Sequence, residues 1–239
     1  MTTNTMRWRR TLGVYIFFSG ILLGMMFAAL LAWADFEASL FNAIPDASAQ
    51  RLESLRCPIL LNRHETGTIS ASFANPSDLT RRRTIDAYIS HGSILLMLEE
   101  RTRFDLEPGE KRTVEWPISS ENAAWGRFVL ARLYVQRNTP LPSRTGSCGV
   151  LVVDLPFGSG VAIAMGIIGA SVLLMAIGAM LWLNKSGKPL RTVDYLNLAL
   201  APVTLLALVF SITGVWLASG LLLVLSFLLI VSIITWVLG

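Results

Sequence analysis

The most reactive side chains in this 239-residue sequence are two cysteines and two histidines. Cys57 and Cys148 lie far apart, and no Cys-x-x-Cys motif brings two thiols together as a redox pair. His64 and His91 are the only histidines, and a zinc site would need more ligands than these at suitable spacing. We therefore expect no metal site and no cofactor.

The sequence also lacks the pattern of a nucleophilic enzyme. A Ser-His-Asp set would combine His91 and Asp86 with one of several serines, but no G-x-S-x-G nucleophile elbow accompanies them. Such sets occur by chance in most domains. We expect no catalytic residues and a protein that is not an enzyme.

The composition indicates a membrane protein. Hydrophobic residues make up 53% of the chain and charged residues only 15%, whereas a soluble domain carries roughly 25% charged residues. The formal net charge is +4, and no basic patch is interleaved with aromatic residues. We expect no nucleic-acid partner.

The first apolar run covers residues 11–33, and its 23 residues exceed the roughly 20 that cross a bilayer. Three arginines precede it in residues 1–10, so the positive-inside rule predicts a cytoplasmic amino terminus. Ala32-Trp33-Ala34 resembles a signal-peptide cleavage site, which leaves a cleaved leader as the alternative. The run is longer than the roughly 7–15 residues of a leader, which favours an uncleaved signal anchor.

A second apolar run, residues 158–183, precedes the basic segment 184–194, which predicts that this helix ends in the cytoplasm. Residues 34–157 would then be extracytoplasmic. From Tyr195 onward, 45 residues carry no charge.

Gly214 and Gly220 interrupt this last stretch near its middle. Two spans, residues 195–213 and 217–238, fit the bilayer thickness, and a single re-entrant hairpin is the alternative. We expect four transmembrane helices with both termini in the cytoplasm.

Small residues recur at four-residue spacing in the first two spans, and such stripes let helices approach closely in lipid. The predicted helix-packing residues are Gly20, Gly24, Ala28, Ala162, Gly166 and Ala170. No Asp, Glu, Lys, Arg or His lies within any span, which argues against a pump or a proton-coupled transporter.

Residues 57–156 show short runs of alternating apolar and polar residues separated by turns. Thr68–Ala74 and Thr84–Ser90 alternate in this way, and Gly149–Leu155 would be the last strand. The pattern predicts an antiparallel immunoglobulin-like β-sandwich inserted between the first two helices. Residues 34–56 would form a linker or contain a short helix.

The stretches FANPSD, LEPGE and TVEWPI resemble bacterial extracytoplasmic immunoglobulin-like domains of the CARDB type. The resemblance covers residues 57–155 only. It implies an extracytoplasmic module used for adhesion, spacing or protein contact, and it supports the fold more than a function.

Three further residue groups carry expectations. Cys57 precedes the first strand and Cys148 begins the last, so in an oxidising compartment we expect a disulfide between them. The cluster Arg81, Arg82 and Arg83 is interpreted as a solvated loop edge, with contact to anionic lipid or an acidic partner as the alternative. Trp116 and Trp125 are interpreted as core and loop-packing aromatics, with a ligand platform as the alternative.

These features predict a multi-pass protein of a bacterial cytoplasmic (inner) membrane, whose partners are membrane lipids and other membrane or envelope proteins. We expect a non-catalytic accessory or scaffold subunit of a membrane complex. A membrane receptor or sensor with a ligand-binding sandwich is the alternative, and a transporter component is less favoured.

Overall fold

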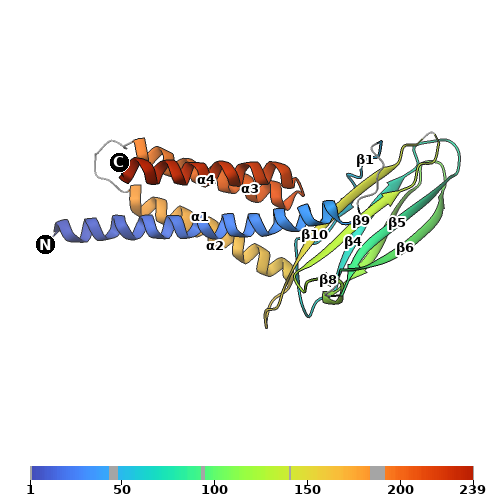
Figure 1. The fold of residues 1–239 in the computed structure, drawn as a ribbon, viewed down its shortest axis with the longest axis horizontal. Coiled ribbons are helices and arrows are strands. Elements are labelled where there is room, and N and C mark those ends of the chain that lie inside the picture. Colours follow the sequence, from blue (N-terminus) through green and yellow to red (C-terminus); the bar gives the residue numbers. More distant parts are fainter. Residues whose placement is uncertain (1, 43–47, 93–94, 140, 184–191, 239) are drawn as a thin grey trace. The chain divides into compact units, whose positions relative to one another are not determined.

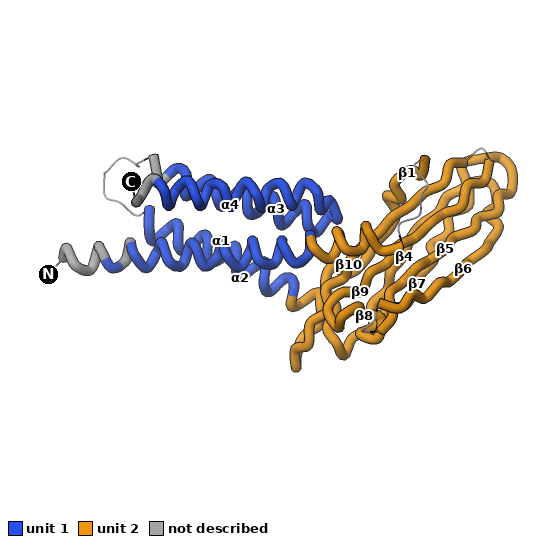
Figure 2. The backbone as a smooth tube through the Cα atoms, in the orientation of Figure 1, with its two compact units in different colours: residues 1–32, 164–239 blue, residues 33–163 orange. Residues whose placement is uncertain are grey.

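A computed structural model describes all residues except 1, 43–47, 93–94, 140, 184–191 and 239 (Figure 1). The chain forms two compact units (Figure 2). Unit 1 is helical and contains residues 1–32 and 164–239, whereas unit 2 contains residues 33–163 and the sheets. Most of the predicted basic segment 184–194 lies outside the described residues.

Within the described residues, four helices are long and apolar enough to cross a membrane. They are α1 (Thr2–Leu40), α2 (Gly160–Leu183), α3 (Thr192–Ile212) and α4 (Trp216–Leu238). The helices α3 and α4 are joined by a tight turn in which Gly214 has a φ of +70°. The structure therefore confirms two separate helices in the uncharged carboxy-terminal stretch.

The helix α1 is longer than the predicted span 11–33, because it continues to Leu40 without interruption. Asp35 and Glu37 follow the apolar run, and they are expected outside the hydrocarbon layer. Polar residues of this kind do not by themselves end a helix. The last helical turns are stabilised instead by packing in unit 2, where Ala34 and Ala38 are fully buried.

In unit 1, the glycines of α1 lie against the backbones and side chains of neighbouring helices. A Cβ added at Gly20 would lie 2.8 Å from the Ser171 carbonyl oxygen, and one at Gly24 would lie 2.6 Å from Ser171 Oγ. Ser171 Oγ donates a hydrogen bond to the Gly20 carbonyl. Ala28 is fully buried, and its carbonyl accepts a hydrogen bond from Ser211 Oγ.

The predicted packing stripe of α2 needs correction. Ala162, Gly166 and Ala170 are exposed, and a Cβ at Gly166 would meet nothing within 4 Å. After Gly160, which is buried at the start of α2, the buried residues instead follow a seven-residue repeat, and they are Ala164, Ser171, Met175, Gly178 and Trp182. The four-residue stripe was misleading because glycine and alanine occur on several faces of this helix.

Unit 2 is a β-sandwich of two sheets, counted over the described residues. The larger sheet contains β1 (Gln50–Arg51), β3 (Leu60–Asn62), β5 (Arg81–His91), β6 (Leu96–Leu106), β8 (Ala123–Ala124), β9 (Phe128–Val135) and β10 (Arg144–Val153). The smaller sheet has the order β2 (Leu55–Arg56), β4 (Gly67–Ala74) and β7 (Lys111–Ile118).

The larger sheet is mixed, which corrects the antiparallel prediction. Its order is β1-β10-β9-β5-β6, with β3 also on β10 and β8 on β9. β10 pairs antiparallel with β9, but β1 and β3 pair with it in parallel. Sequence periodicity reports which face of a strand is buried, and it carries no information on the direction of the neighbouring strand.

The sandwich core confirms the inward faces expected from alternation. Ile69, Trp116 and Ile118 from the smaller sheet pack in one cluster with the inward residues of β5 and β9. Trp116 is fully buried, as expected for a core aromatic.

The predicted linker, residues 34–56, is also corrected. Its first residues continue α1, and its last part supplies β1 and β2, one strand to each sheet. No helix forms between Gln50 and Arg56, because the backbone groups of this segment pair with β10 and β4.

Candidate functional site

Cys57 and Cys148 form a disulfide with a Cα–Cα distance of 6.5 Å. Cys148 does not begin a strand, since β10 starts at Arg144 and Cys148 pairs with Ala131 in its interior. The bridge attaches the segment after β2 to the middle of β10, and both half-cystines pack against the core. Its place is that of a structural crosslink.

The three arginines 81–83 lie in β5 rather than in a loop, so they do not form one surface patch. Arg82 is exposed, and its ion pair with Asp105 on β6 raises the pKa of the guanidinium. Arg83 is on the inward side with Ile85 and is only 8% exposed. Burial, followed by the nearby Arg144 and Arg81 charges, lowers the pKa of Arg83.

The two histidines lie on separate parts of unit 2. His64 is exposed, with Nε2 3.6 Å from an Asp154 carboxylate oxygen, and His91 ends β5. Asp86 forms an ion pair with Arg101 and accepts a hydrogen bond from Gln136. Searched over the described residues, the chain has no group of three or more His, Cys, Asp or Glu side chains that could hold a metal ion.

One end of β6 forms an exposed apolar surface, which we call the β6 edge and define as residues 95–98. Leu96, Met97 and Leu98 are 57%, 45% and 49% exposed. β6 ends the order of its sheet, so in the described structure only its β5 side is paired. The edge therefore combines exposed apolar side chains with unpaired backbone groups.

The other end of β6 is part of the core. Phe104 and Leu106 lie on the same face as Leu96 and Leu98, but they are 8% and 0% exposed. The last residues of β6 are therefore covered by the opposite sheet, whereas its first residues are exposed on both faces.

The position of the β6 edge within the sandwich follows from strand register. Leu96 pairs with His91 on β5, and Ile89 of β5 pairs with Ala131 on β9. The edge is therefore level with the beginning of β9. On the other side of the sheet, Gly149 of β10 pairs with Leu130 and accepts the last turns of α1.

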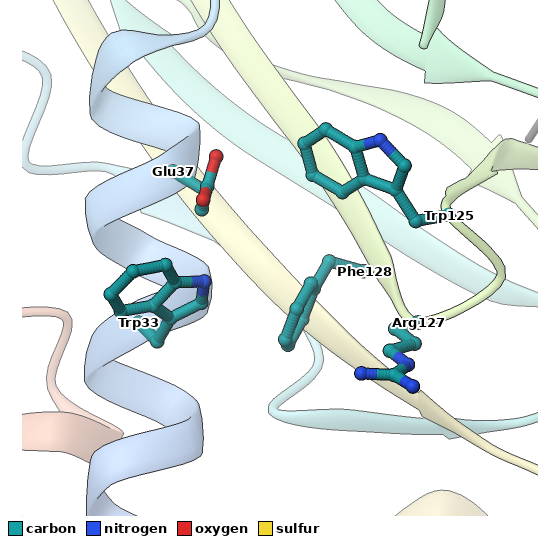
Figure 3. Close-up of a pocket in the computed structure, with 5 residues that line it drawn as sticks. All are labelled: Trp33, Glu37, Trp125, Arg127 and Phe128. Atoms are coloured by element: carbon teal, nitrogen blue, oxygen red, sulfur yellow. The ribbon is translucent and has the colours of Figure 1, made fainter. Parts of the chain in front are cut away.

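An open depression of about 380 Å³ lies in unit 2 beside the last turns of α1 (Figure 3). Trp33 and Glu37 come from α1, Trp125 and Arg127 come from the β8–β9 turn, and Phe128 is the first residue of β9. Trp33 and Trp125 are 55% and 48% exposed. This exposure corrects the interpretation of Trp125 as a packing aromatic.

Sequence reasoning missed both surfaces. The run of apolar residues at positions 94–98 was the available signal for the β6 edge, since it does not alternate as a half-buried strand does. The depression had no comparable signal, because its residues come from two segments about 90 positions apart.

Comparisons with known proteins find weak structural similarity and show no family for this chain. No family model matches the chain, and a search of curated proteins finds no match. The CARDB domain of a Pyrococcus furiosus protein, solved with two metal ions, is 10% identical over 41% of this chain and 84% of that chain, with a TM-score of 0.32.

Two enzymes are also among the similar structures. A β-glucosidase from Listeria innocua is 21% identical over 41% of this chain but only 15% of its own, with a TM-score of 0.30. An alkylpurine DNA glycosylase from Pseudomonas fluorescens is 15% identical over 40% of this chain and 28% of its own, with a TM-score of 0.28. These weak matches carry no argument about activity. The structure itself shows four helices that are long and apolar enough to cross a membrane, and a sandwich of two β-sheets, within the described residues.

Proposed function

We propose that this chain is a non-catalytic accessory or scaffold subunit of a membrane protein complex, and that it binds its partner through the β6 edge. The observation that carries the proposal is the exposure of Leu96, Met97 and Leu98 on an edge strand, of which only the β5 side is paired in the described structure. An exposed apolar strand edge promotes aggregation unless it is covered, and natural proteins protect such edges with charge. Residues 95–98 carry no charge.

The mode of contact follows from the backbone. A partner segment in extended conformation would add a strand to β6, with backbone hydrogen bonds for affinity and side-chain pockets for specificity. Glu99 and Arg101, which form an ion pair directly after the edge, would limit the register of that strand. The hydrogen bond from Arg101 to Asp86 raises the pKa of this guanidinium and ties the side chain to β5.

The partner is a membrane or envelope protein in this proposal. The β6 edge is level with the end of the sandwich that receives the last turns of α1. A partner at this level would have to reach close to the bilayer surface. The positive-inside rule predicts that the contact lies on the extracytoplasmic side.

The test is site-specific photocrosslinking of the full-length protein in its native membrane. A photoreactive residue at Leu96, Met97 or Leu98 should give one discrete protein adduct, and the same residue at Leu79 should not. Leu79 is a matched control because it is an exposed leucine, 64% accessible, at the opposite end of the sheet.

The Leu98→Glu variant should abolish the adduct formed from position 96, whereas Leu79→Glu should leave it unchanged. Crosslinks to lipid alone, or identical products from positions 79 and 98, would refute the proposal. The receptor alternative predicts a ligand-dependent thermal shift that no edge variant would alter.

A further inference from the structure

The turn between β8 and β9 holds a tryptophan in an unusual backbone conformation. Trp125 has a φ of +52° and the next residue, Gly126, has a φ of +67°. The turn is closed by hydrogen bonds from Gly126 N–H to the Ala123 carbonyl and from Arg127 N–H to the Ala124 carbonyl. Positive φ is strained for a bulky side chain, and such strain gathers at binding sites.

Packing inside the protein does not account for this tryptophan. Its indole is 48% exposed, and the Arg127 side chain beside it is also exposed. Asparagine or glycine would adopt the same turn with less strain. The chain thus places a large amphipathic side chain on the surface where a smaller residue would fold more easily.

The depth of the neighbouring Trp33 follows from its place along α1. The 22 uncharged residues 11–32 span about 33 Å as a helix, close to the roughly 30 Å of a hydrocarbon core. The polar residues Asp35 and Glu37 follow immediately. We therefore expect Trp33 at the boundary between hydrocarbon and headgroups, where tryptophan is enriched.

The depression brings the β8–β9 turn to the same level. Trp33 and Glu37 line it together with Trp125 and Arg127, and all four residues belong to unit 2 (Figure 3). If Trp33 lies at this boundary, we expect the turn that lines the same depression to lie near the bilayer surface. The other connection to the membrane agrees, because Phe157 is 74% exposed three residues before α2 begins.

We propose that Trp33, Trp125 and Arg127 form a lipid anchor that binds zwitterionic phospholipid headgroups in the leaflet next to the sandwich. The Arg127 guanidinium would bind the phosphate. Glu37 and the two indole rings would receive the ammonium group, through charge pairing and cation–π attraction. The anchor holds the sandwich in one orientation on the bilayer, and it does not depend on the proposed partner of the β6 edge.

The test uses a single thiol. Both native cysteines are bonded to each other, so Trp125→Cys gives the full-length protein one free thiol for an environment-sensitive fluorophore. In nanodiscs of phosphatidylethanolamine and phosphatidylcholine, we expect blue-shifted emission and at least twofold quenching by headgroup-attached spin labels. The matched control is Leu79→Cys at the opposite end of the sheet, which should show neither change.

Equal quenching at positions 125 and 79 would overturn the anchor. Quenching that appears only after phosphatidylglycerol is added would overturn the assignment of zwitterionic headgroups.

Trp125→Asn provides a second measurement without a label. In detergent it should unfold at the same or a higher temperature than the parent protein, because strain is removed, whereas in nanodiscs the turn amides should exchange hydrogen faster. A lower unfolding temperature in detergent would show that Trp125 acts through internal packing, contrary to the proposal.

Discussion

A methyl group added at Gly149 would test how the end of α1 is attached to the sandwich. Gly149 lies in β10 beside the disulfide, and its N–H donates a 2.9 Å hydrogen bond to Asp35 Oδ1. An ideal Cβ at this position would lie 2.1 Å from the Ala34 carbonyl oxygen and 2.2 Å from its carbon. The Gly149→Ala variant therefore forces a backbone segment away from the sheet.

The size of the effect follows from this geometry. Backbone atoms cannot rotate aside, so α1 must move by roughly 1.4 Å to reach an ordinary contact distance of about 3.5 Å. Overpacking of this kind costs about 1–3 kcal/mol, and a weakened hydrogen bond to a charged group adds about 1.5 kcal/mol. We expect a total of about 3 kcal/mol, or a fall in Tm of about 6–12 °C for a unit of this size.

Thermal unfolding of the full-length protein in detergent measures the effect, and two other glycines provide graded controls. A Cβ at Gly146, also in β10, would lie 3.0 Å from Leu55 Cδ2, the end of a flexible side chain. Gly146→Ala should therefore lower Tm by a smaller amount. A Cβ at Gly166, inside α2, meets nothing within 4 Å, so Gly166→Ala should not lower Tm, since alanine favours a helix more than glycine does. Equal stability of Gly149→Ala and Gly146→Ala would refute the described contact.

Three further outcomes are expected. The disulfide joins positions 91 residues apart. Replacing Cys57 and Cys148 by serine should therefore lower the free energy of unfolding of the sandwich by up to about 4–5 kcal/mol. An unfolding midpoint that does not change with reductant would contradict this. Ser90→Ala removes the hydroxyl that accepts from Leu130 N–H and donates to the Asn122 carbonyl, so the denaturant midpoint should fall by the equivalent of about 1–3 kcal/mol, and an unchanged midpoint would argue against both bonds. Ser211→Ala removes the buried hydrogen bonds to the Ala28 carbonyl and Ser219. Unfolding in a denaturing detergent should show that the free energy of unfolding falls by about 0.6–1.7 kcal/mol. The control variant Thr213→Ala should not show this fall.

The parts of this protein that sequence predicted well are those set by local composition. Uncharged runs of bilayer length predicted the four helices, and period-two alternation predicted β4, β7, β9 and the inward face of β5. The disulfide followed from cysteine count and topology. Each of these features depends on the chemistry of neighbouring residues along one segment.

Features that depend on two distant segments were predicted poorly. Arg83 looked like a surface charge, but its position on β5 turns it inward. Trp125 looked like a packing residue, but its turn leaves it exposed beside Trp33. In both cases the side chain's surroundings are decided by strand pairing across the fold.

The sequence alone determined that the chain has membrane-length helices, one inserted domain of short strands and a cysteine pair suited to crosslink it. These features depend on the hydrophobicity of consecutive residues, which can be read directly along the chain. Only the tertiary structure decided that β1 and β3 join β10 in parallel and that α1 continues onto the sheet. It also decided which end of β6 is uncovered and which aromatic residues share a depression. These features depend on which strands pair and which segments pack closely together. They could not be predicted from the sequence because many strand registers satisfy the same hydrophobic pattern, whereas side-chain packing selects one of them.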